Sequence, residues 1–78
     1  MKHKKDSFQG ICNGLLDLLQ STAIGDKIGS IEYDENKANV IICERLGNHW
    51  TYDVHTSDGL EFAEDLMKNI LQKLKKTA

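Results

Sequence analysis

The sequence contains no proline and only five aromatic residues among its 78. Without proline, no position in the chain forbids a long helix or strand. No apolar run approaches the roughly 20 residues that cross a bilayer, so we expect no membrane association. A chain of this length predicts one domain, residues 1–78, with a modest core.

Cysteine is also scarce, since only Cys12 and Cys43 are present. They lie on different predicted elements and match no CxxC or zinc-binding spacing. We therefore expect two reduced, buried thiols in an intracellular protein, with a disulfide between them as the alternative. The basic start, residues 2–5, is not followed by the apolar stretch of a secretory signal, so a cytoplasmic location is expected.

Basic residues are scarce in the middle of the chain. All twelve acids lie between Asp6 and Asp65, and only Lys27, Lys37 and Arg45 lie among them. This segment carries a charge of about −9, twelve acids against three bases. Such a segment repels polyphosphates and attracts a basic protein surface. The other bases are at the two ends: Lys2, Lys4, Lys5, Lys68, Lys73, Lys75 and Lys76.

The chain does contain a regular series of helix and strand patterns. Apolar residues at three- and four-residue steps indicate helices, and period-two alternation indicates strands. The predicted elements are a helix over residues 6–24, strands over 27–34, 37–45 and 48–55, and a helix over 59–75. We expect an α+β fold of order α-β-β-β-α, a three-stranded antiparallel meander with two helices packed on one face. Residues 1–5 and 76–78 are expected to be tails.

The first predicted helix has a cap at either Asp6 or Ser7 and a stop at Gly25. Gly10 and Gly14 lie inside it, four residues apart, where each costs about 1 kcal/mol relative to alanine. Either another backbone approaches them closely, or they lie on an exposed face of the helix.

The last predicted helix has the most consistent signals. Asp58 and Glu61 form a capping-box-like pair, with Ser57 as the alternative cap. Acids occupy its first turns and lysines its last, which complements the helix dipole. Its expected apolar stripe is Leu60, Ala63, Met67, Ile70, Leu71 and Leu74, widened by Phe62 and Leu66.

The stretch over residues 47–55 decides which sheet face is covered. Gly47-Asn48 suits a two-residue type II′ turn, which would pair Cys43 with Tyr52. The face under the helices would then hold Ile41, Cys43, Arg45, Trp50, Tyr52 and Val54, joined by Ile31 and Tyr33 if the first hairpin has an odd-numbered loop. The opposite face would hold Val40, Ile42, Glu44, Leu46, His49, Thr51, Asp53 and His55.

No predicted element remains to cover that opposite face. Apolar residues on an uncovered face indicate a contact surface, here for a second copy of the chain or for another protein. The alternative is an ordinary solvated face. The expected dimer or contact residues are Val40, Ile42, His49, Thr51 and His55.

The histidines of this stretch do not indicate catalysis or metal binding. His49 and His55 lie six positions apart on one strand, roughly 20 Å, which no single ion bridges. Asp53 and His55 lack further ligands, and no nucleophile accompanies them, because Cys43 is expected on the other face. We expect no cofactor, no metal site and no enzymatic activity.

The α-β-β-β-α order and the chain length resemble those of the double-stranded-RNA-binding domain. That family carries a lysine-rich motif at the start of its second helix, where it meets phosphates. Here the corresponding segment, SDGLEFAED over residues 57–65, has acids and no base. The resemblance is limited to the order of elements and implies no RNA-binding role.

The charge distribution predicts a small acidic interaction protein, expected to be a homodimer, that binds a basic surface on another protein. A regulator or inhibitor of a nucleic-acid-binding protein or complex, as mobile elements often encode, suits this size and charge. The alternative is nucleic-acid binding through the lysine-rich termini, and a third interpretation is that the acids only solubilise the fold. The acids expected to contact the partner are Glu32, Asp34, Glu35, Glu44, Asp53, Glu61, Glu64 and Asp65.

Overall fold

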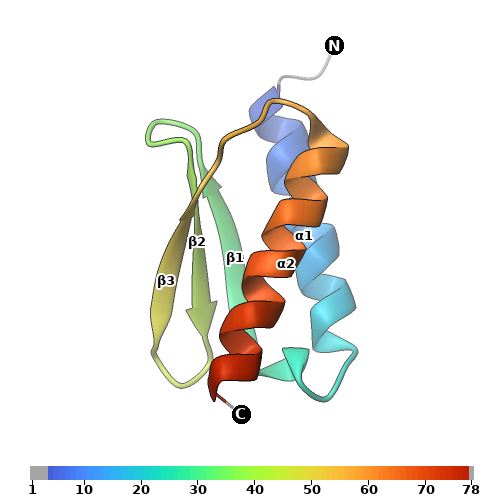
Figure 1. Cartoon of the computed structure of the whole chain (residues 1–78), viewed down its shortest axis with the longest axis vertical. Helices are drawn as coiled ribbons and strands as arrows, with labels where there is room; N and C mark the ends of the chain where they lie inside the picture. Colours follow the sequence, from blue (N-terminus) through green and yellow to red (C-terminus); the bar gives the residue numbers. More distant parts are fainter. Residues whose placement is uncertain (1–3, 78) are drawn as a thin grey trace.

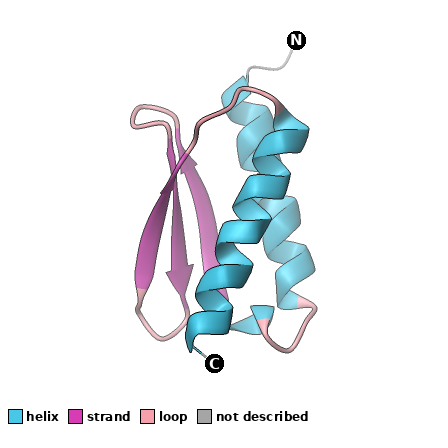
Figure 2. Ribbon diagram, in the orientation of Figure 1, coloured by secondary structure: helices cyan, strands magenta, loops and turns pink. Residues whose placement is uncertain are grey.

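The computed structural model describes residues 4–77, which form two helices packed on one antiparallel sheet. The elements in chain order are α1 (Lys4–Gln20), the 3-10 helix η1 (Gly25–Lys27), β1 (Ile28–Asp34), β2 (Asn39–Glu44), β3 (His49–Asp53) and α2 (Gly59–Thr77). β2 is the central strand, and both helices lie on the same side of the sheet and run in the same direction (Figure 1, Figure 2). The predicted α+β meander is confirmed.

The core lies between the sheet and the helices. α2 contributes Phe62 and every fourth residue after it as far as Leu74, and α1 contributes Phe8, Cys12 and Leu19. Phe8 stacks on Phe62 with ring centroids 4.2 Å apart. Full burial of each large apolar side chain stabilises the fold by about 1.5–3 kcal/mol. The sheet contributes Ile28, Ile31, Val40 and Ile42.

The apolar stripe of α2 is centred differently from the prediction. Phe62 and Leu66, expected at its margin, are completely buried, whereas Leu60, expected inside, is 81% exposed. Residues three and four apart share a helix face, so the apolar positions of this helix fit more than one stripe. Contact with the sheet selects the stripe that contains Phe62.

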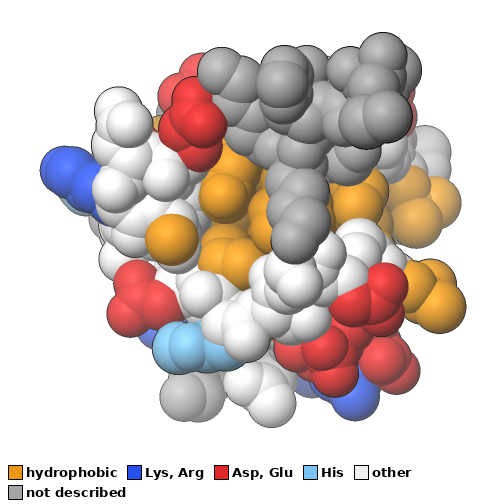
Figure 3. Space-filling model, turned by 90° about the horizontal axis from the view of Figure 1, so that it is seen from above, with side chains coloured by type: hydrophobic (Ala, Val, Ile, Leu, Met, Phe, Trp, Pro, Cys, Tyr) orange, Lys and Arg blue, Asp and Glu red, His pale blue; other side chains and the backbone are white. Residues whose placement is uncertain are grey.

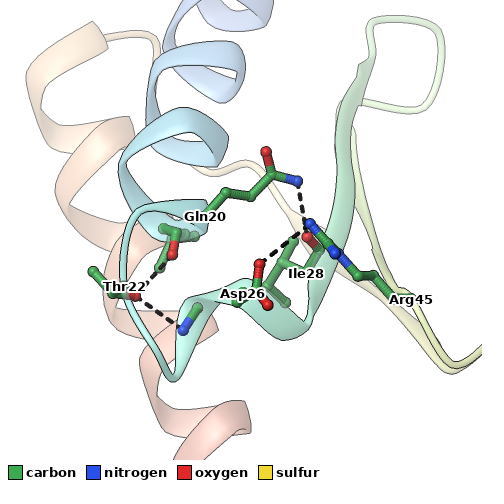
Figure 4. A network of polar contacts seen from close by, with 7 residues as sticks. Gln20, Thr22, Asp26, Ile28 and Arg45 are labelled. Carbon is green, nitrogen blue, oxygen red and sulfur yellow. Dashed lines mark hydrogen bonds and ion pairs between the residues drawn. The ribbon is translucent and has the colours of Figure 1, made fainter.

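The end of α1 differs from the prediction, since the helix stops at Gln20. The Thr22 hydroxyl donates to the Leu19 carbonyl at 2.7 Å and accepts from the Gly25 amide at 3.0 Å. A Cβ on Gly25 would overlap the Leu19 carbonyl oxygen and lie 2.7 Å from Thr22 Oγ1. Gly25 is therefore required for a close contact in the turn that follows the helix, shown in Figure 4.

Both helices extend into segments that the sequence predicts to be tails. α1 begins at Lys4, so the predicted caps Asp6 and Ser7 lie inside the helix. α2 continues to Thr77 rather than stopping at Lys75. The remaining tail residues, 1–3 and 78, lie outside the described residues.

The start of α2 confirms the predicted cap. The Asp58 carboxylate accepts from the Glu61 amide at 3.3 Å. The Thr56 hydroxyl accepts from the Asp58 amide at 3.1 Å and donates to the Glu61 carboxylate. Thr56 thus links the two acids of the cap, and Ser57 is exposed.

The turn between β2 and β3 differs from the predicted two-residue turn. The Gly47 amide donates to the Glu44 carbonyl at 3.1 Å, and the Glu44 amide donates to the Asn48 carbonyl at 2.7 Å. These bonds enclose a three-residue loop that ends on Gly47, whose φ of 101° favours glycine. Cys43 consequently pairs with His49 rather than Tyr52. The register moves by three residues, an odd number, and this exchanges the faces of β2.

The prediction for the two faces of β2 is therefore wrong. Val40 and Ile42, expected on the uncovered contact face, are completely buried under the helices. Trp50 and Tyr52 do face the helices, opposite Ile42 and Val40 respectively. Ile41 lies on the uncovered face instead.

The first hairpin has a four-residue loop rather than an odd-numbered one. Asp34 pairs with Asn39, and the loop between them ends on Ala38, whose φ is 51°. Tyr33 still faces the helices, because its partner in β2 is Val40.

A bulge at Gly29 adjusts the start of β1. Ile28 pairs with Glu44, but Ser30 pairs with Cys43, so one extra residue lies in β1. Ile28 and Ile31, three positions apart, are consequently both buried. Strict alternation would have placed one of them outside.

Side chains of α1 cover the free edge of β1. The Gln9 amide accepts from the Tyr33 backbone N–H at 2.9 Å and donates to the Ile31 carbonyl at 3.4 Å. Gln20 donates to the Ile28 carbonyl at 3.2 Å (Figure 4). The two glutamines therefore supply hydrogen bonds that another strand would otherwise make.

Candidate acidic interface

The face of the sheet opposite the helices is the main candidate surface, and we call it the outer sheet face. Strand alternation places nine residues on it in three rows across the sheet. The rows are Asp34–Asn39–Asp53, Glu32–Ile41–Thr51 and Ser30–Cys43–His49. Neither helix covers this face (Figure 2). The sequence prediction missed Asn39, Ile41 and Cys43 because it placed β2 in the wrong register, and it did not name Ser30 of β1.

The charge of the outer sheet face has one sign. Its nine residues include the carboxylates of Glu32, Asp34 and Asp53 and no lysine or arginine. Glu32 and Asp53 are exposed, and within residues 4–77 neither makes a hydrogen bond or ion pair through its side chain. Asp34 is half-buried and accepts from the amides of Asn36 and Lys37 at 3.0 and 3.3 Å. Glu32 and Asp53 are thus the carboxylates of this face that the fold does not already use.

The remaining predicted acids lie elsewhere. Glu35 lies in the loop after β1, and Glu44 lies at the other end of the sheet, beside Arg45. Glu61, Glu64 and Asp65 lie in the first turns of α2. The eight predicted acids therefore do not form one surface.

The topology nevertheless gathers most of these acids toward one end of the molecule. β1 and β3 end where α2 begins (Figure 1). Asp34 and Asp53 therefore lie at the same end as Glu61, together with Asp58, which the sequence indicated only as a cap. Figure 3 looks down on this end, where acidic side chains gather on its surface.

The acids of α2 act on β3 from the helix side. Burial raises the pKa of Tyr52 above its ordinary value of 10.0, and the carboxylates of Asp65 and Glu61 raise it further. Glu64 instead forms an ion pair with Lys68, with 3.8 Å between Oε2 and Nζ. Acids consequently lie on both sides of β3, Asp53 on the outer sheet face and Asp65 on the helix side.

Of the predicted contact residues, His49 and Thr51 are exposed on the outer sheet face. His55 is also exposed, but it lies after β3 and lines a hollow of about 330 Å³ together with Phe8 and Tyr33. Among the described residues, no three His, Cys, Asp or Glu side chains are arranged to hold a metal ion.

The two cysteines are free thiols in different surroundings. Cys12 is completely buried, and this burial raises the pKa of its thiol from 9.0 to about 11. Cys43 is half-buried in the centre strand of the outer sheet face. The alternative of a disulfide between them is wrong for this structure.

The helix layer has a second uncovered surface. Leu15, Leu60, Ala63 and Met67 line an apolar groove of about 410 Å³ between α1 and α2. A Cβ on Gly14 would have nothing within 4 Å, and the same holds for Gly10. The two glycines therefore lie on an exposed helix face, and within one chain no other backbone approaches them.

Comparisons with models of protein families, with curated proteins and with solved structures find no match for this chain. Within the described residues, no helix is both long and apolar enough to cross a membrane.

Proposed function

We propose that this protein is a small acidic interaction module that binds a basic surface of another protein through its outer sheet face. A regulator or inhibitor of a nucleic-acid-binding protein or complex, of the kind that mobile elements encode, suits this mode of binding. The observation that carries the proposal is the uncovered sheet face with three carboxylates and no lysine or arginine.

The composition of the outer sheet face suits a protein partner. Ile41 lies at the centre of its middle row, between Glu32 on β1 and Thr51 on β3. An apolar residue with polar and acidic neighbours resembles the arrangement of an interface, in which the centre is apolar and the rim is polar. Carboxylates at the rim accelerate association with a positive surface.

The alternative, nucleic-acid binding through the lysine-rich termini, finds less support. The start of α1 and the end of α2 lie at opposite ends of the molecule (Figure 1). The molecule is 39 Å along its longest axis, so the start of α1 and the end of α2 in one chain do not form one surface. Phosphates of a nucleic acid would also be repelled by the acids between those ends.

The proposal is tested with two matched charge reversals. Glu32→Lys reverses the charge at the outer sheet face, and Asp17→Lys makes the same charge change on an exposed position of α1. Proteins retained from a native lysate are identified by mass spectrometry with the unchanged chain and with each variant. We expect a basic partner that is retained by the unchanged chain and by D17K and is lost by E32K.

Ionic strength provides a second readout with the purified partner. Attraction between exposed charges weakens once the Debye length falls to about 10 Å, near 0.1 M salt. The affinity of the unchanged chain should therefore fall with added salt, whereas that of E32K should change little. Equal loss of the partner with D17K, or salt-independent binding, would reject the outer sheet face as the interface. Retention of nucleic acid in place of a protein would support the alternative.

A further inference from the structure

The two edges of the sheet differ in whether other parts of the chain form hydrogen bonds with them. The edge of β1 is covered by Gln9 and Gln20 of α1. On β3, the bond between the Glu44 amide and the Asn48 carbonyl fixes which residues face β2. Hydrogen-bonded and non-hydrogen-bonded pairs alternate along an antiparallel ladder. The next residues of β3 whose backbone N–H and C=O groups point toward β2 are therefore Trp50 and Tyr52.

The open edge is therefore formed by the backbone of His49, Thr51 and Asp53. Within residues 4–77, no hydrogen bond to these outward N–H and C=O groups is present beyond the β2–β3 ladder. β3 lies at the margin of the sheet, and no other element lies beyond it (Figure 1). An exposed row of unpaired backbone groups is a template for another strand.

β3, a five-residue strand that ends on Asp53, lacks three of the features that often prevent edge pairing. Lysine, proline and bulges blunt an exposed edge, and the sequence of β3, HWTYD, contains no lysine or proline. The β2–β3 pairing is regular over all five residues of the strand. The fold thus covers one edge and leaves the other suited to pairing.

We propose that β3 pairs antiparallel with β3 of a second copy of this chain, around a two-fold axis at Thr51. The result is a six-stranded sheet with all four helices on one face. This register uses all five residues and makes Thr51 hydrogen-bond with Thr51 of the second copy, because the outward groups are those of the odd-numbered residues. This interaction goes beyond the proposed function, and neither depends on the other.

The side chains of β3 are complementary to themselves in this register. His49 lies opposite Asp53 of the second copy, twice in the dimer, on the outer sheet face. Trp50 lies opposite Tyr52 of the second copy in the closer, non-hydrogen-bonded pairs, on the helix side. Opposed aromatic pairs and threonine pairs stabilise antiparallel strands, and an imidazole N–H can donate a hydrogen bond to a carboxylate. The side chains of β3 are thus complementary to those of an antiparallel copy of the same strand, and this is the main support for a second copy as the partner.

The charges along α2 support the same two-fold axis. The Trp50 indole N–H donates to Asn69 Oδ1 at 2.9 Å, and Tyr52 lies in the field of Asp65. The part of α2 level with Thr51 therefore lies between Asp65 and Asn69. Rotation about Thr51 brings the acidic first half of α2 toward the basic second half of the other copy. Complementary charges arranged in this way favour self-association.

The test is sedimentation equilibrium over a range of chain concentrations. We expect association to a particle of twice the chain mass. Thr51→Lys places two lysines against each other at the axis and should weaken association about tenfold or more. Ser30→Lys makes the same charge change on the same sheet face but on the covered strand β1, and should leave association unchanged.

A charge exchange identifies the register. His49→Asp faces two carboxylates with one another and should weaken association, and the double variant H49D/D53H should restore it, because the opposed pairs are the same with their positions exchanged. Backbone amides of His49, Thr51 and Asp53 should exchange hydrogen slowly in the dimer and rapidly in T51K.

Three results would overturn the proposal. The first is a monomer at every concentration, with rapid exchange at these amides, which would leave the edge to another partner or to solvent. The second is a dimer that T51K does not weaken. The third is a dimer abolished by Leu60→Ser, which would assign association to the groove between α1 and α2 instead.

Discussion

At the scale of the residue, Cys12 predicts how stability depends on pH. Below pH 9 the thiol is protonated in the folded and the unfolded chain, so it contributes no pH dependence. Between its unfolded pKa of 9.0 and its folded value of about 11, the unfolded chain releases the proton and the folded chain keeps it. Stability is therefore lost as pH rises through this window, by about 2 kcal/mol at its upper end.

The measurement is urea unfolding from pH 8 to 11 with the unchanged chain and with Cys12→Ala. The variant is expected to be less stable at neutral pH, because it leaves a small cavity, but to lose less stability as pH rises. Parallel pH profiles would contradict the assignment. A thiol reagent offers an independent check, since it should modify Cys43 and leave Cys12 intact in the folded protein.

Substitution of glycine by alanine is expected to have opposite effects on stability at two positions, Gly25 and Gly14. Gly25→Ala forces a Cβ against the Leu19 carbonyl oxygen and should destabilise the fold by about 2 kcal/mol or more. Gly14→Ala adds a methyl group where nothing lies within 4 Å and should stabilise α1 by about 1 kcal/mol. Thermal unfolding of both variants measures the difference. A destabilised G14A would show that a second molecule approaches this helix face.

At the scale of the element, the hydrogen bonds that cover the β1 edge predict that removal of one polar side chain, Gln9, lowers the stability of the fold. Gln9→Ala leaves the Tyr33 N–H and the Ile31 carbonyl without their partner, so it should destabilise the fold by about 1–2 kcal/mol. The Tyr33 amide should also exchange hydrogen faster. Gln72→Ala on the exposed face of α2 is the control and should change stability by less than about 0.5 kcal/mol. Equal stability of Q9A and Q72A would show that water replaces the lost bonds.

The helices and strands themselves could be predicted from the sequence. The sequence predicts the first residue of α2 correctly, because the Asp58 cap, the apolar spacing and the order of charges all indicate the same start. The predicted end of α1 is four residues too late, because Gly25 is typical of the residue that follows a helix. Its role is contact with Leu19 and Thr22, which depends on the path of the chain after the helix.

The register of the sheet could not be predicted, and this decided the candidate site. Gly47 fits both a two-residue turn and the third position of a three-residue loop. The other loop ends on Ala38 in a left-handed conformation, which an alanine does not signal. A register shift by an odd number of residues exchanges the faces of β2. Val40 therefore lies in the core and Ile41 on the outer sheet face, the reverse of the prediction.

At the scale of the whole molecule, part of the charge separation along the chain becomes a separation in space. Acids of the middle segment lie on the uncovered sheet face and at the end where α2 begins, whereas Asp26 and Glu44 lie at the opposite end and Asp17 lies on α1. The lysines in the second half of α2 lie toward that opposite end. Acids that the fold does not use for caps, turns or ion pairs repel one another without stabilising it. Residues such as Glu32 are therefore expected to reduce stability while they serve binding.

This expectation distinguishes a binding surface from acids that only keep the domain soluble. Glu32→Lys places a positive charge in the row next to Asp34 and Asp53, so it should raise the melting temperature by about 2 °C at low salt. Added salt should remove the gain, because it screens exposed charges beyond about 10 Å at 0.1 M. Asp17→Lys changes the net charge equally but lies on α1, away from this face, and should gain less.

Thermal unfolding of both variants at two salt concentrations measures these differences, and equal gains would mean that only net charge matters. A gain confined to E32K, in the same variant that loses the basic partner, would show that the carboxylate is kept for contact at the expense of stability.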